Sequence, residues 1–228
     1  MAKLKSKSFK DIYDSDSFYD LEQAIEIVKK ASSAKFDESI DISVKLGVDP
    51  NKSDQNVRGA VTLPNSLGKE VVVAVFADGD DSSAAEKAGA DFVGMDDLAE
   101  KFTKEEIAVD VVISTNSAMK VVGQLGQVLG PKGLMPNPKT GTVSDDVITA
   151  IKNVKAGQVR FRTDKNGIIH GSIGKVSFET NKIKANASAL LEELKKLKPA
   201  SAKGVFIGNI ALSSSMGPGV KINSSDLV

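Results

Sequence analysis

The sequence contains no cysteine, no tryptophan and a single histidine, and aromatic residues make up only 5% of it. The missing cysteine excludes disulfide bonds, thiolate metal sites and cysteine nucleophiles, and it suits a protein of the reducing cytoplasm. The lone His170 excludes metal sites built from several histidines, and a histidine-based catalytic triad would depend on that residue alone. With 41% hydrophobic residues and few aromatics, we expect a globular chain with a mainly aliphatic core.

Long apolar runs are missing as well, so we expect no membrane-spanning segment. The first ten residues carry four lysines, but no apolar stretch follows them, and they are therefore not expected to be a secretory signal. Such a basic arm would add only sequence-independent affinity for an anionic partner.

Both ends of the chain alternate apolar and polar residues, as strands with one buried face do. Residues 40–48 are apolar at every second position, and residues 158–163 repeat this pattern. The dipeptide Asn166-Gly167 is a turn signal, so residues 168–175 are predicted to return as the hairpin partner of residues 158–163.

Helices are also predicted near both ends. Residues 20–31 place apolar side chains three and four apart, with Asp20 and Gln23 in a capping-box spacing. Thr180 is predicted to cap a helix that runs to residue 197. Residues 205–212 are apolar on both faces, which favours a central strand.

The middle of the chain has a different pattern. Residues 71–77 and 109–115 are continuous apolar runs, which are typical of parallel strands covered on both faces. A shorter strand is expected at residues 91–94, and Ser144 is a candidate helix cap. The predicted helices of this part are residues 82–88, 96–102, 116–129 and 145–155. Strands that alternate with helices indicate a doubly wound α/β domain.

The two patterns predict a discontinuous two-layer α+β domain with a Rossmann-like three-layer α/β domain inserted in it. The first comprises residues 1–67 and 160–228, and the second residues 68–159, with a hinge at the two chain crossings near Leu67 and Gly157. The outer pieces together carry 21 basic and 16 acidic residues, whereas the insert carries 9 and 14. A formal net charge of zero therefore hides one basic and one acidic part.

The most specific string is LGPKGLMPNPKTGTV at residues 129–143, a stiff loop of three prolines and three glycines. It resembles the signature of the bacterial ribosomal protein family of the large-subunit lateral stalk, the "L-one" family. Three further segments resemble the same family: AKFDES at residues 34–39, LGVDPNKSDQNVRG at 46–59 and SSSMGPGV at 213–220.

This resemblance implies the discontinuous fold described above and a non-enzymatic function. A member of the family would bind 23S ribosomal RNA in the mobile stalk of the large subunit, in the cytoplasm. It would also contact the outgoing transfer RNA of the E site and repress its own operon by binding the messenger RNA. We accordingly expect partners among RNA and the ribosome, a monomer when free, and no cofactor or metal.

The resemblance also implies an RNA-binding site drawn from both ends of the chain. Phe36 would pack on a ribose or base, Glu38 would accept from a 2′-hydroxyl or an exocyclic amine, and Ser215 stands where the family has threonine. Lys132 and Lys139 would form a second RNA contact. The expected RNA-binding residues are Lys35, Phe36, Glu38, Ser39, Arg160, Arg162, Lys165, His170, Asn209, Ser213, Ser215, Met216 and Gly217.

Pattern alone gives plainer interpretations. Phe36 would more often be a core residue, His170 a structural histidine and Met216 a filler of a core gap. The alternative function is that of a nucleotide-binding enzyme using the inserted domain, but neither G-x-G-x-x-G after residues 71–77 nor G-x-x-x-x-G-K-[ST] occurs. An acidic cluster at residues 78–81 could hold Mg²⁺, although a solvated loop is the commoner outcome. A protein–protein adaptor is the third class.

Overall fold

The computed structural model describes residues 13–68, 71–104, 107–202 and 204–223. The chain divides into two compact units, here called the terminal unit (residues 1–67 and 159–228) and the inserted unit (residues 68–158). It therefore crosses between the units twice, after Leu67 and after Gln158. The four N-terminal lysines lie outside the described residues.

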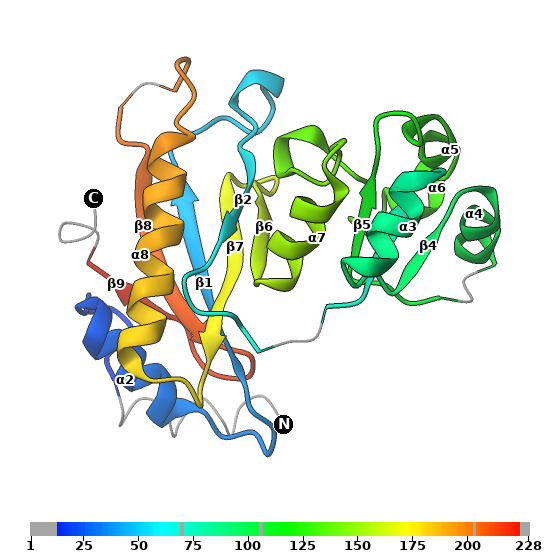
Figure 1. Ribbon diagram of the computed structural model, residues 1–228. Helices are drawn as coiled ribbons and strands as arrows, with labels where there is room; N and C mark the ends of the chain where they lie inside the picture. The colour runs from blue at the N-terminus through cyan, green and yellow to red at the C-terminus, as the bar shows by residue number, and fades with distance from the viewer. Residues whose placement is uncertain (1–12, 69–70, 105–106, 203, 224–228) are drawn as a thin grey trace. The chain divides into compact units, whose positions relative to one another are not determined.

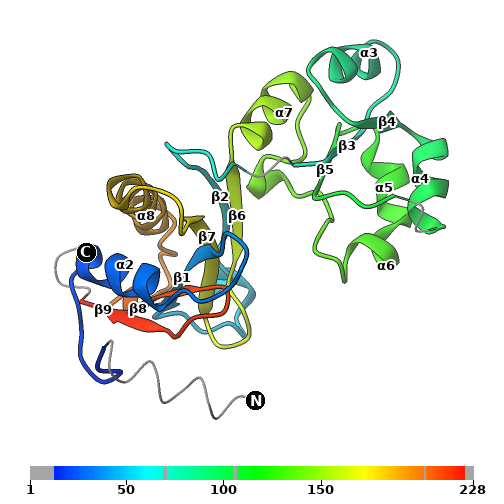
Figure 2. The same cartoon turned by 90° about the horizontal axis from the view of Figure 1, so that it is seen from below.

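The terminal unit is built on a four-stranded antiparallel sheet in the order β7-β1-β8-β9 (Figure 1). The strands are β7 (Ile168–Lys175), β1 (Ser39–Leu46), β8 (Ile207–Ser214) and β9 (Val220–Ile222). Helices α2 (Leu21–Ala31) and α8 (Thr180–Lys196) cover one face of this sheet (Figure 2). The result is the two-layer α+β arrangement predicted from the alternating pattern.

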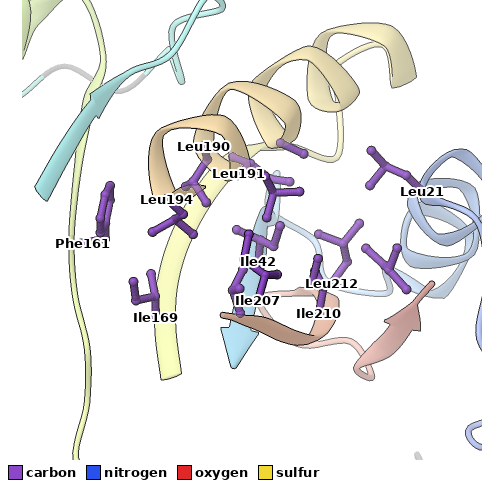
Figure 3. Close-up of a cluster of buried hydrophobic side chains, with 14 of the residues drawn as sticks. Leu21, Ile42, Phe161, Ile169, Leu190, Leu191, Leu194, Ile207, Ile210 and Leu212 are labelled. Carbon is purple, nitrogen blue, oxygen red and sulfur yellow. The ribbon is translucent and has the colours of Figure 1, made fainter. Parts of the chain in front are cut away.

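The core of this unit lies between the sheet and the two helices. Ile42 of β1, Ile210 of β8 and Leu190 of α8 are among the aliphatic side chains that fill it (Figure 3). Ile40, Ile42 and Val44 are completely buried, as the period of two requires. Burying each such side chain contributes about 1.5–3 kcal/mol, which holds β1 in a single register.

The opposite face of the sheet carries mostly polar residues that are half-buried or exposed. Cross-strand pairs align them in rows, since Ser43 stands opposite His170 and Ala211, and Asp41 stands opposite Ser172 and Ser213. Here this polar side is called the open face, with the residues Ser39, Asp41, Ser43, Lys45, His170, Ser172, Asn209, Ala211, Ser213 and Lys221.

The predicted hairpin is wrong in its pairing. β6 (Gln158–Arg162) forms a separate two-stranded sheet with β2 (Arg58–Thr62), whereas β7 pairs with β1. The turn itself is present, with Gly167 at φ 73° and the Asp164 N–H donating to Ile168 O at 2.9 Å. Beyond the turn the two strands join different sheets. The alternating pattern could not reveal this, because it specifies which face of a strand is buried and not which strand lies alongside it.

A short 3-10 helix, η1 (Ser53–Gln55), precedes β2, and the chain leaves the terminal unit a few residues after that strand. Asn186 of α8, which is fully buried, holds the chain in place at this point through hydrogen bonds. Its Oδ1 accepts from the Asn65 N–H at 3.0 Å, and its Nδ2 donates to Asn65 O at 3.0 Å and to Ile173 O at 2.8 Å. The Asn186 amide thus pairs with the N–H and the C=O of Asn65 in the way that a neighbouring strand would.

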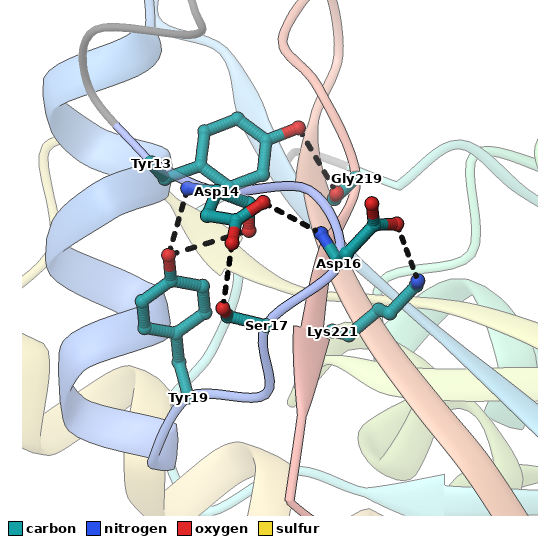
Figure 4. A network of polar contacts seen from close by, with 7 residues as sticks. All are labelled: Tyr13, Asp14, Asp16, Ser17, Tyr19, Gly219 and Lys221. Carbon is teal, nitrogen blue, oxygen red and sulfur yellow. Dashed lines mark hydrogen bonds and ion pairs between the residues drawn. The ribbon is translucent and has the colours of Figure 1, made fainter.

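Residues 13–19 form a turn against the free edge of β9 (Figure 4). The Tyr19 N–H donates to Lys221 O at 3.1 Å, and the Tyr13 hydroxyl donates to Gly219 O at 3.3 Å. Asp14 closes the turn by accepting from the Ser17 hydroxyl at 2.9 Å. This turn covers an edge strand and braces the loop between β8 and β9.

The helix caps differ from the predictions in three places. Asp20 precedes α2, but its side chain makes no capping hydrogen bond. Thr180 is the first residue of α8, and Glu179 occupies the cap position. In the inserted unit, Asp146 and not Ser144 caps the last helix, by accepting from the Thr149 N–H at 3.1 Å.

The inserted unit contains a parallel three-stranded sheet in the order β4-β3-β5, with helices on both faces. Val73 and Val75 of β3 pack toward α3 and α7, whereas Ala74 and Phe76 pack toward α4, α5 and α6. The three-layer α/β fold class is therefore confirmed. The elements are β3 (Val73–Phe76), α3 (Asp80–Lys87), β4 (Phe92–Gly94), α4 (Asp96–Thr103), β5 (Val111–Ser114), α5 (Met119–Gln124), α6 (Gly126–Leu129) and α7 (Val147–Lys155).

The single helix predicted for residues 116–129 is split into α5 and α6 at Leu125, whose backbone departs from helical angles. Two glycines, Gly123 and Gly126, flank the break, and glycine is a poor helix former. The signature loop, residues 129–143, follows α6 and contains the short helix η2 (Pro138–Thr140). Its end runs beside β5, where the Ser114 N–H donates to Thr142 O at 2.9 Å.

Candidate RNA interface

The candidate site lies at one end of the antiparallel sheet, where β1 begins and β8 ends. The Ser215 N–H donates to Ser39 O at 3.1 Å, and the Ser39 N–H donates to Ser215 Oγ at 3.1 Å. These two hydrogen bonds join positions 176 residues apart in the sequence. They place the segment 33–39 beside the segment 213–217, and both segments contain expected RNA-binding residues. Here the pair of segments is called the binding edge.

Two large apolar side chains are exposed on the binding edge. Phe36 is 59% exposed and Met216 is 54% exposed. The interpretation of Phe36 as a core residue is therefore wrong, and Met216 fills no gap in the core. Exposed aromatic and thioether groups on a braced backbone are suited to pack against a ribose or an unstacked base.

A side chain at Gly217 would collide with the Ser214 hydroxyl as it now stands. A Cβ built there would lie 2.3 Å from Ser214 Oγ, a distance that real atoms do not tolerate. The Gly217 N–H donates to Ser214 O at 3.2 Å, so the loop is folded tightly on the end of β8. A glycine here lets the backbone turn closely beside Met216.

Glu38 departs from its expected role as an RNA acceptor. Glu38 is only 1% exposed, and its carboxylate accepts backbone hydrogen bonds on both oxygens. A direct contact with RNA would require the segments that bury this carboxylate to move. The expectation from sequence overlooked that a carboxylate is also a strong acceptor for backbone N–H groups.

The pKa of Glu38 lies below its ordinary value. Burial acts in the opposite direction, but the Ser214 side chain and the N–H groups of Ala34, Met216 and Ser33 outweigh it. Each of the three N–H groups forms a hydrogen bond with the carboxylate, whereas Ser214 Oγ is buried without a hydrogen-bond partner among the described residues. We therefore attribute the lowered pKa to the backbone donors.

A second group of expected residues lies further along the open face. His170 is 60% exposed, with Nδ1 at 3.2 Å from Ser43 Oγ and Nε2 at 3.5 Å from Asp164 Oδ2. Ser43 is four residues along β1 from Ser39, which corresponds to about 13 Å. His170 is thus a surface residue of the open face and not a histidine of the core.

The acidic neighbours of His170 have opposite pKa shifts. The pKa of Asp164 is lowered, chiefly by the hydrogen bond from the Ile168 N–H. The pKa of Asp41 is raised, chiefly because its carboxyl is partly buried on the open face, against the opposing effects of Ser172 and His170. Asp41 was not among the expected site residues, although the alternation of residues 40–48 already placed it on the polar side.

The remaining expected residues are distributed over three surfaces. Lys35 is exposed on the binding edge, and Asn209 and Ser213 lie on the open face. Arg160 is half-buried and Arg162 exposed on β6, in the two-stranded sheet, and the exposed Lys165 lies in the turn after it. Lys132 and Lys139 are exposed in the signature loop of the inserted unit and so belong to a different unit from the others.

Within the described ranges, no group of three or more His, Asp or Glu side chains is suited to hold a metal ion. Among the same residues no helix has the length and apolar character needed to cross a membrane.

Sequence comparison decides the family. Residues 28–218 match the sequence model described as the ribosomal protein L1p/L10e family. The chain belongs to this family. Proteins called "Large ribosomal subunit protein uL1" from Pseudoalteromonas atlantica and Methylococcus capsulatus are 57% and 58% identical to it, over the whole of this chain and 98% and 99% of theirs. A third, from Chromohalobacter salexigens, is 55% identical with complete coverage of both chains.

Membership of the L1p/L10e family resolves the choice between the enzyme and the ribosomal protein. The family is one of structural ribosomal proteins, so the chain is not an enzyme, and the resemblance seen in the sequence is confirmed. The match spans both units and includes the signature loop and the binding edge.

Proposed function

We propose that the chain is a structural protein of the large ribosomal subunit, in the cytoplasm, and that its terminal unit binds the ribosomal RNA of the stalk directly. The observation that carries this proposal is the binding edge, where hydrogen bonds between Ser39 and Ser215 join two segments that both expose large apolar side chains, Phe36 and Met216. Lys35 is exposed on the same edge. The printed name of its relatives supports the assignment to the large subunit.

The chemistry of the open face suits folded RNA. Helical RNA presents 2′-hydroxyls and base edges across a shallow minor groove, and proteins recognise it largely through shape and hydrogen bonds. Ser39, Ser43 and Ser213 lie on the polar side of the sheet, and Ser43 stands opposite His170. The moderate excess of basic residues in the outer pieces means that phosphate contacts supply only part of the affinity.

We further propose that the same terminal unit binds the messenger RNA of its own operon, because one binding edge would serve either RNA if the two share a local shape. The signature loop, through Lys132 and Lys139, would supply a second contact to the E-site transfer RNA. The two chain crossings, after Leu67 and Gln158, would serve as a hinge for the inserted unit. The free protein is expected to be a monomer.

A salt-titrated binding curve tests the central proposal. The purified protein is compared on the stalk segment of large-subunit ribosomal RNA and on an unrelated hairpin of equal length. We expect a preference of about a hundredfold or more for the stalk RNA. Equal, weak binding to both RNAs that vanishes with salt would contradict specific recognition and would favour a protein–protein adaptor instead.

The chain offers a matched pair of variants for this assay. Phe36→Ala removes the aromatic ring of the binding edge, and stacking on a base contributes about 1–3 kcal/mol. Phe18→Ala removes a ring of the same type and the same 59% exposure from the turn before α2. We expect a loss of about tenfold or more for Phe36→Ala and little change for Phe18→Ala; equal losses would refute the assignment of Phe36.

A further inference from the structure

We propose that Glu38 is a positioning residue, which gives the binding edge its shape by tying the Met216 loop to the segment before β1, and that it does not itself touch RNA. This inference rests on the proposed RNA-binding function and assigns a role within that site. It replaces the direct contact that the sequence led us to expect.

The two carboxylate oxygens of Glu38 serve two different parts of the chain. Oε1 accepts from the Ser33 N–H at 3.0 Å and from the Ala34 N–H at 2.9 Å. Oε2 accepts from the Met216 N–H at 3.1 Å, across 178 residues of sequence. One side chain therefore links the approach to β1, which carries Lys35 and Phe36, with the loop that carries Met216.

The chemistry of this site requires an ionised carboxylate. Three backbone N–H donors converge on it, and a carboxylate offers only acceptors, with about four lone-pair directions. Because Glu38 is 1% exposed, its carboxylate and not water is the acceptor for these N–H groups, and a variant that lacks an acceptor oxygen leaves a donor without its present partner. The lowered pKa keeps the group ionised at neutral pH.

The position of the Met216 loop depends on few other contacts. The Ser39–Ser215 pair holds its beginning, the Gly217 N–H bond to Ser214 O closes it on β8, and the Tyr13 hydroxyl holds its end at Gly219 O. The Met216 N–H is directed inward to Glu38, while its side chain is 54% exposed. Loss of the hydrogen bond from the Met216 N–H to Glu38 should free the backbone at Met216, and the exposed thioether would then lose its fixed orientation.

Glu38→Gln separates the two links. Glutamine keeps one acceptor oxygen and replaces the other with an NH₂ group that only donates. The oxygen is expected to stay with the two donors Ser33 and Ala34, which leaves the NH₂ group facing the Met216 N–H. The variant should therefore release the Met216 loop while the segment before β1 remains attached.

A carboxylate of the inserted unit is a matched control. Asp146 also accepts from a backbone N–H and from a hydroxyl, those of Thr149, at 3.1 Å and 2.7 Å, but it belongs to the inserted unit and not to the binding edge. Asp146→Asn makes the same chemical change outside the site, and asparagine is as good a cap residue as aspartate. It should leave the binding edge as it is.

The test combines amide hydrogen exchange with RNA affinity on the full chain. For Glu38→Gln we expect faster exchange at Met216, unchanged exchange at Ser33 and Ala34, and binding to the stalk RNA about tenfold weaker or more. The slope of log affinity against log salt should not change, because no phosphate contact is lost. Asp146→Asn should bind within about twofold of the unaltered protein.

Two outcomes would overturn the proposal. Weaker RNA binding with unchanged exchange at Met216 would make Glu38 a direct contact, and faster exchange at Met216 with unchanged affinity would make its link irrelevant to RNA. If Glu38→Gln does not fold, Glu38→Asp provides the test, since it keeps the charge but is one methylene too short to reach both segments. Full affinity of Glu38→Asp would also refute the proposal.

The failure of the proposed function is distinguishable from these outcomes. It would show in the unaltered protein as a lack of preference for the stalk RNA over the control hairpin. The exchange pattern of Glu38→Gln does not involve RNA and reports on the link between Glu38 and Met216 in either case.

Discussion

Replacing Gly217 by alanine should disturb the binding edge more than its small size suggests. The added Cβ would lie 2.3 Å from Ser214 Oγ and 3.5 Å from Ser214 Cβ, so the loop or the serine must move by roughly 1 Å. Forcing an extra carbon into a packed site costs about 1–3 kcal/mol. The φ angle of Gly217 is not left-handed, so the cost is one of space and not of backbone strain.

The assay is urea unfolding together with binding to the stalk RNA, and the Ser214→Ala background isolates the cause. That serine hydroxyl is buried without a partner among the described residues, so its removal should be close to neutral. With the hydroxyl absent, Gly217→Ala should cost less than about 1 kcal/mol, which gives a coupling energy of about 1–2 kcal/mol in a double-mutant cycle.

Gly219→Ala is the control within the same loop, because a Cβ at Gly219 meets no atom within 4 Å. It should change stability by no more than about 0.5 kcal/mol. An equal cost of Gly217→Ala with and without the Ser214 hydroxyl would refute the steric explanation. An equal cost at Gly217 and Gly219 would show that the loop does not distinguish the two positions.

Three further predictions concern other parts of the chain. Asn186→Ala should lower the free energy of unfolding by about 1–3 kcal/mol, measured in urea, because it removes the partner of both partly buried backbone groups of Asn65 and of the buried Ile173 O; a change below about 0.5 kcal/mol would contradict this role of Asn186. The folded pKa of Asp164 is lowered from its ordinary value of 3.8, so its stabilising contribution is complete above that value and is lost as the pH falls through the folded pKa. Asp164→Asn should therefore reduce the acid sensitivity of the protein below about pH 4, as followed by circular dichroism, and an unchanged acid transition would argue against it. Replacing both Lys132 and Lys139 by alanine should weaken transfer-RNA or ribosome binding without changing the unfolding curve, and unchanged binding would remove the signature loop from the interface.

Several elements of the fold followed from local patterns. The alternation at residues 40–48 correctly predicted β1 and its buried face, and the apolar runs correctly predicted β3 and β5. These patterns are reliable because a strand or helix buries its own side chains with a period that belongs to the backbone. The caps were harder, since Asp146 and Ser144 are both good cap residues and only the final path of the chain selects one.

The pairing of the strands could not be predicted from local patterns. Residues 158–163 and 168–175 carry the signals of a hairpin and form its turn, yet the two strands join different sheets. Gly171 of β7 would meet Leu190 of α8 if it carried a Cβ, so this strand lies directly under the helix. This packing of β7 under α8 exists only in the folded unit, so it could not be predicted from a short stretch of sequence.

The sequence by itself determined the family, through the signature loop, and determined which faces of the main strands are buried. It also supplied the residues of the binding edge. The tertiary structure alone decided that the Glu38 side chain is buried within this edge, and that Phe36 and Met216 are both exposed on it. The physical reason is that exposure and hydrogen-bond partners depend on segments that meet across more than 170 residues, where local periodicity carries no information.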